Sequence, residues 1–226
     1  MDIFRQNFII AVDGGAGTGK STLSNEIARR LNIIHIDTGA LYRAATLYFL
    51  NNNIEITDEN IDKNLENIKI ELKNNNGGLY VFLNGEDVTG KIRTEFVSNT
   101  VPMVAKYPPL RKKIVAIQRE IGNSCSCIID GRDIGTVVFP EANLKIFLTA
   151  SLEKRAQRRK SDLAENNENV DLNLVKSDLE KRDMQDKTRE HSPLKMADDA
   201  IQIDTTENTV EQTADIIIDL LKQKVM

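Results

Sequence analysis

Residues 14–21 have the types and spacing of a phosphate-binding loop. They read Gly-Gly-Ala-Gly-Thr-Gly-Lys-Ser and fit the pattern G-x-x-x-x-G-K-[ST]. Glycines let the backbone curl until successive N–H groups point at phosphate oxygens. Lys20 would reach the β- and γ-phosphates of a nucleotide, and the Ser21 hydroxyl would ligate Mg²⁺. The predicted triphosphate-binding residues are Gly14, Gly15, Ala16, Gly17, Thr18, Gly19, Lys20, Ser21 and Thr22.

The segments on either side of this loop support that interpretation. The apolar run of residues 8–12 is typical of a buried parallel strand. After the loop, Leu23, Ile27, Ala28 and Leu31 recur at helical spacing. A helix beginning there would direct the positive end of its dipole at an anion. A glycine-rich turn without a ligand is the alternative, and the strand and helix make it the weaker one.

Two further groups of polar residues follow short apolar runs. Asp130-Gly131-Arg132-Asp133 comes directly after a predicted strand at 126–129, where functional groups gather in parallel sheets. Two acids and an arginine in a sharp turn are costly unless their charges are used or solvated, so we predict a functional role. Asp37 to Arg43 follows a predicted strand at 33–36 and opens a helix near Ala40, after a turn at Gly39. An anion at that helix terminus and a capped helix with Arg43 in solvent remain equally open.

Residues 151–192 are rich in charge, with ten Lys or Arg and ten Asp or Glu. Two helical stretches flank a polar middle at 165–169. Arg155 and Arg159 share one face of the first stretch, which also carries Arg158. Arg182, Asp186 and Arg189 share one face of the second. Such helices are often simply solvated, but arginine faces on a helical hairpin in a P-loop protein favour a lid.

The remaining elements complete an α/β fold. Alternating residues at 68–72, an Asn- and Gly-rich turn, an apolar run at 79–83 and Asn84-Gly85 predict an antiparallel meander over about 68–89. Residues 51–65 are interpreted as surface. Further helices are expected at about 95–106 and 110–121, further strands at 144–148 and 199–204, and a closing helix with a Thr209–Gln212 capping box. The predicted fold is a P-loop parallel sheet wrapped by helices, with a small antiparallel β insertion and a helical lid.

We expect a single domain over residues 1–226. Its predicted parts are a core (about 1–50, 95–150 and 193–226), the β insertion (about 51–94) and the arginine-rich lid (about 151–192).

Composition and cysteine spacing restrict the partners and the cellular compartment that we expect for the chain. The 226 residues are 40% hydrophobic and 28% charged, with a net charge of -4, so nothing indicates a nucleic-acid or membrane partner. Cys125 and Cys127 are one residue apart in a predicted strand and would point to opposite faces, which argues against a mutual disulfide. With His35 and His191 they make a poor metal site. We expect reduced thiols in a cytoplasmic protein.

Three classes of P-loop function stay open at this point. A GTPase should carry an N-K-x-D motif, which the chain lacks. A motor or regulatory ATPase needs an acid at the end of a hydrophobic strand, and Asp130 could serve as that acid. A small-molecule kinase fits best, because phosphoryl transfer needs alignment, positive charge and exclusion of water, and an arginine lid supplies the last two.

The motifs resemble those of the bacterial cytidylate kinases, in the nucleoside monophosphate kinase group of P-loop proteins. The resemblance runs nearly end to end. It rests on the glycine-rich loop, Asp37 to Arg43, Gly85 to Val88, Ile92 to Thr94, Asp130 to Pro140, and Lys181 to Arg189 with Arg182, Asp183 and Asp186. It implies transfer of the γ-phosphate of ATP to CMP and dCMP, with Mg²⁺.

The resemblance also implies roles for individual residues. The implied catalytic residues are Lys20, Arg132, Arg158, Arg159 and Arg189. The implied substrate-binding residues are Thr38, Tyr42, Arg43, Arg111, Arg132, Asp133, Arg182, Asp186 and Arg189; the implied metal ligand is Ser21. Among the base readers, Asp133 would accept from the cytosine amino group and face the uracil carbonyl lone pair to lone pair, a mismatch of about 1–3 kcal/mol.

One departure from the family pattern concerns base selectivity. Pro102 stands near a position where the family usually has serine, so cytosine would be read with one contact fewer or through Ser98. A kinase for UMP and a non-catalytic nucleotide-binding regulator are the alternatives. We expect a monomer that binds small nucleotides and neither nucleic acid nor membrane.

Overall fold

The computed structural model describes residues 7–75, 78–165 and 170–225. The chain divides into two compact units: unit 1 consists of residues 1–35 and 125–226, and unit 2 of residues 36–124. The expected division of one domain into core, insertion and lid stays a prediction.

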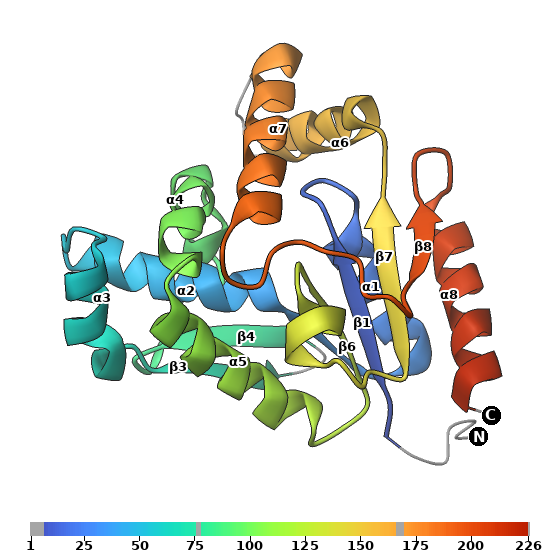
Figure 1. Ribbon diagram of the computed structural model, residues 1–226, viewed down its shortest axis with the longest axis horizontal. Helices are drawn as coiled ribbons and strands as arrows, with labels where there is room; N and C mark the ends of the chain where they lie inside the picture. The colour runs from blue at the N-terminus through green and yellow to red at the C-terminus, as the bar shows by residue number, and fades with distance from the viewer. Residues whose placement is uncertain (1–6, 76–77, 166–169, 226) are drawn as a thin grey trace. The chain divides into compact units, whose positions relative to one another are not determined.

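Unit 1 is built around a five-stranded sheet with the strand order β2-β6-β1-β7-β8, to which it contributes every residue except the last two of β2. The strands are β1 (Ile9–Gly14), β2 (Ile34–Asp37), β6 (Cys127–Gly131), β7 (Leu144–Thr149) and β8 (Ile201–Asp204). β1 pairs in parallel with β6 and β7, and β7 pairs in parallel with β8. Parallel pairing brings the carboxyl ends of these strands to one edge, where the loops that follow them meet (Figure 1). The predicted P-loop parallel sheet is confirmed.

Helices α1 (Lys20–Leu31) and α8 (Val210–Val225) bury their apolar faces with the strands. Leu23 and Ile27 of α1, predicted from helical spacing, lie in the same cluster as Ile10 of β1 and Ile217 of α8. At the start of α8, Thr209 and Gln212 exchange side-chain and backbone hydrogen bonds, so the predicted capping box is present.

Helices α6 (Leu152–Glu165) and α7 (Leu172–Thr188) lie side by side and form the predicted hairpin (Figure 1). They share a small core of their own, to which the P-loop contributes Ala16. The other buried residues of this core are Ala156, Leu163, Val175 and Leu179. The polar middle of the hairpin falls largely outside the described residues.

Unit 2 packs helices against a three-stranded antiparallel sheet of order β3-β4-β5. Its elements are α2 (Thr38–Asn51), α3 (Asp58–Asn64), β3 (Ile70–Asn75), β4 (Gly78–Leu83), β5 (Glu86–Asp87), α4 (Glu95–Ala105) and α5 (Pro108–Gly122), with 3₁₀ turns η1 (Leu65–Asn67) and η2 (Lys91–Arg93). Asn84 and Gly85 both have positive φ, 51° and 85°, as a two-residue hairpin turn requires. The predicted meander is confirmed; its first turn, at 76–77, lies outside the described residues.

Three local expectations were wrong. Residues 58–64 form helix α3, whose Ile61 is buried in the core of unit 2, so the polar stretch is not only surface. Gly39 lies inside α2 rather than in a turn, because Asp37 caps the helix directly by accepting a hydrogen bond from the Ala40 N–H. Cys125 precedes β6 instead of lying in it; within the described residues neither cysteine forms a disulfide, and Cys127 is buried.

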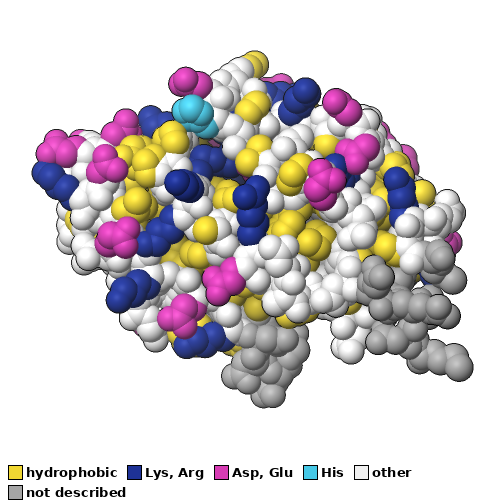
Figure 2. All heavy atoms as spheres, turned by 60° about the horizontal axis from the view of Figure 1, so that its bottom comes forward, with side chains coloured by type: hydrophobic (Ala, Val, Ile, Leu, Met, Phe, Trp, Pro, Cys, Tyr) yellow, Lys and Arg dark blue, Asp and Glu magenta, His cyan; other side chains and the backbone are white. Residues whose placement is uncertain are grey.

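Charges of both signs are mixed over the face drawn in Figure 2, where Lys and Arg side chains alternate with Asp and Glu. That face carries no broad patch of one sign, in line with the net charge of -4. Among the described residues, no helix combines the length and apolar character needed to cross a bilayer.

Candidate nucleotide site

The P-loop joins β1 to α1 and needs glycine at its start. Gly14 has φ +153°, and a Cβ there would lie 2.4 Å from the Leu148 carbonyl oxygen of β7. The loop therefore leaves the sheet through a space that only glycine fits. Within the described residues, no side chain caps the N-terminus of α1 and no acid occupies its first turn. Its first N–H groups are available to an anion.

Lys20 is folded back into this loop. Its Nζ donates to the Gly15 carbonyl over 2.6 Å and to Thr18 Oγ1 over 3.3 Å, and the residue is 6% exposed. Burial lowers the pKa of Lys20 to about 7, and the positive charge of Arg132 adds to the effect. An arriving polyanion would favour the charged form of Lys20, which burial and Arg132 disfavour.

Ser21 lies beside an acid from the carboxyl end of β6. Its hydroxyl donates to Asp130 Oδ2 over 3.0 Å, and the other carboxylate oxygen lies 2.5 Å from His35 Nε2. The Ser21 hydroxyl and the Asp130 carboxylate are hard oxygen donors, the kind that Mg²⁺ prefers. The donor set therefore fits a magnesium ion.

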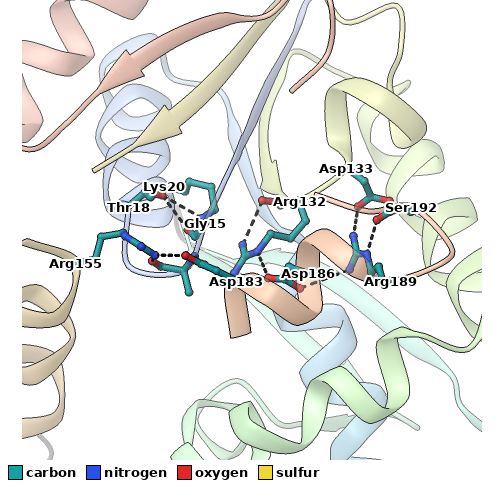
Figure 3. A network of polar contacts seen from close by, with 12 residues as sticks. Gly15, Thr18, Lys20, Arg132, Asp133, Arg155, Asp183, Asp186, Arg189 and Ser192 are labelled. Carbon is teal, nitrogen blue, oxygen red and sulfur yellow. Dashed lines mark hydrogen bonds and ion pairs between the residues drawn. The ribbon is translucent and has the colours of Figure 1, made fainter. Parts of the chain in front are cut away.

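A chain of ion pairs runs from β6 to α7 (Figure 3). Arg132 Nε donates to Asp186 Oδ2 over 2.7 Å. Arg189 follows α7; its guanidinium lies 3.7 Å from Asp133 and 3.8 Å from Asp186, and its Nε donates to the Ser192 carbonyl. Burial disfavours the charged form of Asp186, but Arg132 outweighs it and the pKa of Asp186 is lowered. Four predicted residues in or just after β6 and α7 thus form one charged cluster: Arg132, Asp133, Asp186 and Arg189.

A second ion pair ties the helical hairpin to the loop. Arg155 of α6 donates to Asp183 of α7 over 2.6 Å and to the Ala16 carbonyl over 3.1 Å. The other oxygen of Asp183 accepts from the Ala16 N–H over 3.3 Å. The Asp183 carboxylate therefore accepts hydrogen bonds from both a P-loop N–H and an arginine, as a phosphate group could.

Arg158 lines a cavity of about 240 Å³ beside the P-loop. Its guanidinium donates to the Thr205 carbonyl over 2.6 Å and to Thr205 Oγ1 over 3.1 Å. The wall also includes Gly17, Thr18, Gly19, Asn208 and Thr209. The cavity is next to the predicted triphosphate site and has both polar and apolar walls.

In unit 2, four predicted residues occupy the start of α2 and the first turns of α5. Thr38 and Tyr42 are buried, and Arg111 lies with its guanidinium 5.4 Å from the centre of the Tyr42 ring. Arg43 donates to Asp37 over 2.6 Å, while its buried Nε has no hydrogen-bond partner among the described residues. An unsatisfied guanidinium N–H at a helix start favours the anion-binding alternative over an Arg43 in solvent.

A family model for cytidylate kinase matches residues 10–223. The chain belongs to the cytidylate kinase family. The chain is 45% identical over 222 residues to the cytidylate kinase of Geobacillus sp. (strain WCH70), covering 98% of this chain and 99% of the relative. It is 47% identical to that of Caldicellulosiruptor saccharolyticus, over 93% of this chain and 94% of the relative. The resemblance inferred from the motifs is confirmed.

The solved structures add a likeness of fold. An uncharacterized protein from Eubacterium ventriosum ATCC 27560 aligns with a TM-score of 0.51 at 16% identity, covering 96% of this chain and 99% of that chain.

The predicted site residues thus form two sets. Unit 1 brings together Arg132, Asp133, Asp186 and Arg189 through the contacts above, and the charges of Arg132, Arg182 and Asp186 are close enough to Lys20 to shift its pKa. Unit 2 brings together Tyr42 and Arg111 as a cation–π pair. Arg159 is half-buried on α6, in the hairpin that carries Arg155. The role of each residue stays a prediction.

Four residues of these clusters had no predicted role. Asp183 lies against the P-loop, His35 beside Asp130, and Thr205 beside Arg158. The fourth, Asp13, accepts from the Ile134 and Gly135 N–H groups, each over 2.8 Å, directly after Asp133. For Asp13 and Thr205 a signal exists, because both lie at or just past the carboxyl end of a parallel strand.

Asp13 should make stability depend on pH. Burial raises its pKa to about 6, although two backbone N–H groups work in the opposite direction. Between the ordinary carboxylate value and pH 6 the folded chain therefore binds more protons than the unfolded chain, and Asp13's contribution to stability falls as pH rises. The loss is at most about 3 kcal/mol for a two-unit shift. Urea unfolding of wild type and Asp13→Asn from pH 4 to 7 measures it; parallel curves would contradict it.

Proposed function

We propose that the chain transfers the γ-phosphate of ATP to CMP and dCMP, giving CDP or dCDP and ADP. The family match over residues 10–223 carries the proposal. The loop, the buried Lys20 and the arginine clusters support it, because in-line phosphoryl transfer depends on positioning and positive charge rather than on a strong base. The attacking phosphate oxygen of the acceptor is already anionic.

The donor nucleotide is assigned to the P-loop and the cavity beside it. The phosphates would accept from the loop N–H groups and from Lys20, and the cavity lined by Arg158 and Thr205 would take the base. Ser21 and Asp130 would hold Mg²⁺, which neutralises the negative charge on the transferring group when bound.

We propose the acceptor-binding residues from the family match, for each unit by itself. In unit 1, Arg132 is proposed for the phosphate of the acceptor, Arg182 and Asp186 for its pentose and Asp133 for its base. In unit 2, Thr38 and Arg43 are proposed for the phosphate, and Tyr42 and Arg111 for the base. The Arg111 guanidinium carbon lies over the Tyr42 ring, 5.4 Å from its centre, so a cation and an aromatic face are already together in the part of unit 2 proposed to contact the base.

The hairpin arginines are proposed to close over the phosphates. Arg155, Arg132 and Arg189 are each paired with a carboxylate of the same unit. Phosphate groups would compete with Asp133, Asp183 and Asp186 for these cations, so substrate binding would exchange internal ion pairs for contacts to the reacting groups. Arg158 and Arg159 would add positive charge from α6.

We place the enzyme in the cytoplasm, in pyrimidine nucleotide metabolism, as a monomer without nucleic-acid or membrane partners.

Product formation from ATP with CMP, dCMP, UMP or AMP tests the proposal. CMP and dCMP should be phosphorylated with kcat/KM about 5–150-fold above that for UMP, the size of a cytosine-reading contact of about 1–3 kcal/mol. Equal rates with UMP would make the chain a general pyrimidine kinase. Tight ATP binding without CDP formation would make it a regulator.

A further inference from the structure

His35 contacts Asp130, one of the two candidate magnesium ligands, through the carboxylate oxygen that does not face Ser21. It lies on β2, and its Nε2 is 2.5 Å from Asp130 Oδ1 on the neighbouring strand β6. Its Nδ1 is 2.8 Å from the Asn25 side-chain oxygen on α1. The imidazole is 10% exposed and the carboxylate 5%. Three elements of unit 1 are therefore joined through one ring.

This contact fixes the orientation of the Asp130 carboxylate. One oxygen accepts from the Ser21 hydroxyl over 3.0 Å and the other is adjacent to the imidazole. A carboxylate bonded through both oxygens has lost its freedom to rotate about the Cβ–Cγ bond. Oδ2 is thereby kept on the side of Ser21, where a shared cation would be bound. Since Asn25 holds the opposite ring nitrogen, the imidazole itself is also fixed.

We propose that His35 is a positioning residue that aligns Asp130 with Ser21 for Mg·ATP. The inference rests on the proposed function, because it requires that these two residues hold the metal. His35 touches neither nucleotide nor metal in this assignment and acts through Asp130. Groups that orient a metal ligand typically change metal affinity or activity about 10–100-fold when they are removed.

A purely structural role for His35 makes a different prediction. If the role of His35 is only structural, its substitution would lower the unfolding temperature and leave the preference of the protein for Mg·ATP over free ATP unchanged. If His35 positions Asp130, its substitution lowers that preference. The two roles are separated by the ratio of the dissociation constants for ATP with EDTA and ATP with excess Mg²⁺, measured calorimetrically without turnover.

The variants His35→Met and His35→Gln form a matched pair of similar size. Glutamine can donate to Asp130, whereas methionine cannot. We expect His35→Met to reduce the ratio about 10–100-fold, with ATP binding in EDTA unchanged, and His35→Gln to retain most of it. His191→Met is the control, because His191 is exposed and is the other histidine of the chain.

Each outcome decides the inference. An unchanged ratio in folded His35→Met, or an equal loss in the methionine and glutamine variants, overturns it. If His35→Met does not fold, ¹⁵N NMR of wild type decides: the His35 ring resonances should shift when Mg²⁺ is added to the ATP complex, and those of His191 should not. Absence of a His35 shift overturns the inference. A wild type without any preference for Mg·ATP would instead refute the assigned metal site in the proposed function.

Discussion

Lys20→Met should lower kcat for CMP phosphorylation about a thousandfold, the loss expected when one preorganised charge is removed from a developing anion. The Nζ group is held inside the P-loop by Gly15 and Thr18, at the assigned position of the transferring phosphate. Methionine keeps the length of the side chain and removes the charge and the donors. Steady-state kinetics with CMP and Mg·ATP measure the effect.

The fold should tolerate this change. Burial lowers the pKa of Lys20 to about 7, which means that the folded state disfavours its charged form. The resulting loss of stability is full below pH 7 and shrinks as pH rises toward the ordinary lysine value, because the unfolded chain binds more protons in that range; at pH 8 most of it remains. The unfolding midpoint of the variant at pH 8 should equal or exceed that of wild type.

Lys145→Met is the matched control. Lys145 is also buried, on β7, but it pairs with Asp199 and has no assigned role in the site. Its substitution should leave kcat within a few-fold of wild type. Comparable kcat losses in both variants, or near-normal turnover of Lys20→Met, would refute the phosphate role of Lys20.

The sequence predicts the elements whose pattern is local. β1, the glycine loop and α1 follow one another within about two dozen residues, and their periods change from strand to helix at the loop. The β insertion is equally readable, because Asn84-Gly85 permits the positive φ angles of a hairpin turn. Helix α3 was missed because only Ile61 marks a buried face in an otherwise polar segment.

The contacts that complete the site are not local and leave no pattern. His35 and Asp130 are 95 positions apart, and Asp183 and Ala16 are 167 apart. Their contacts depend on β2 lying next to β6 and on α7 returning to the P-loop, which are properties of the tertiary fold. A single histidine in an apolar strand could equally be a satisfied core residue. Motifs can identify Lys20 or Arg132. Residues such as His35 and Asp183, which contact Asp130 and the P-loop, become visible only in three dimensions.

Asp133→Asn should remove the preference for CMP over UMP. Asp133 is 5% exposed, and its backbone is held because the next two N–H groups donate to Asp13. In the proposed role, a carboxylate fixed in this way would accept from the cytosine amino group and repel the uracil carbonyl oxygen. Asparagine has nearly the same shape but can turn a donor toward that oxygen. The ratio of kcat/KM for CMP to that for UMP should fall about 5–150-fold, which corresponds to about 1–3 kcal/mol.

The ratio distinguishes base reading from a general electrostatic role. Asp133 also lies 3.7 Å from the Arg189 guanidinium, so its substitution changes the charge around an assigned phosphate ligand. That second effect would alter kcat/KM for both acceptors equally and leave the ratio unchanged. Asp215→Asn, an exposed ion-pair acid on α8, should change neither value. An unchanged ratio with lower activity toward both nucleotides would therefore contradict base recognition by Asp133 and indicate that Asp133 positions Arg189.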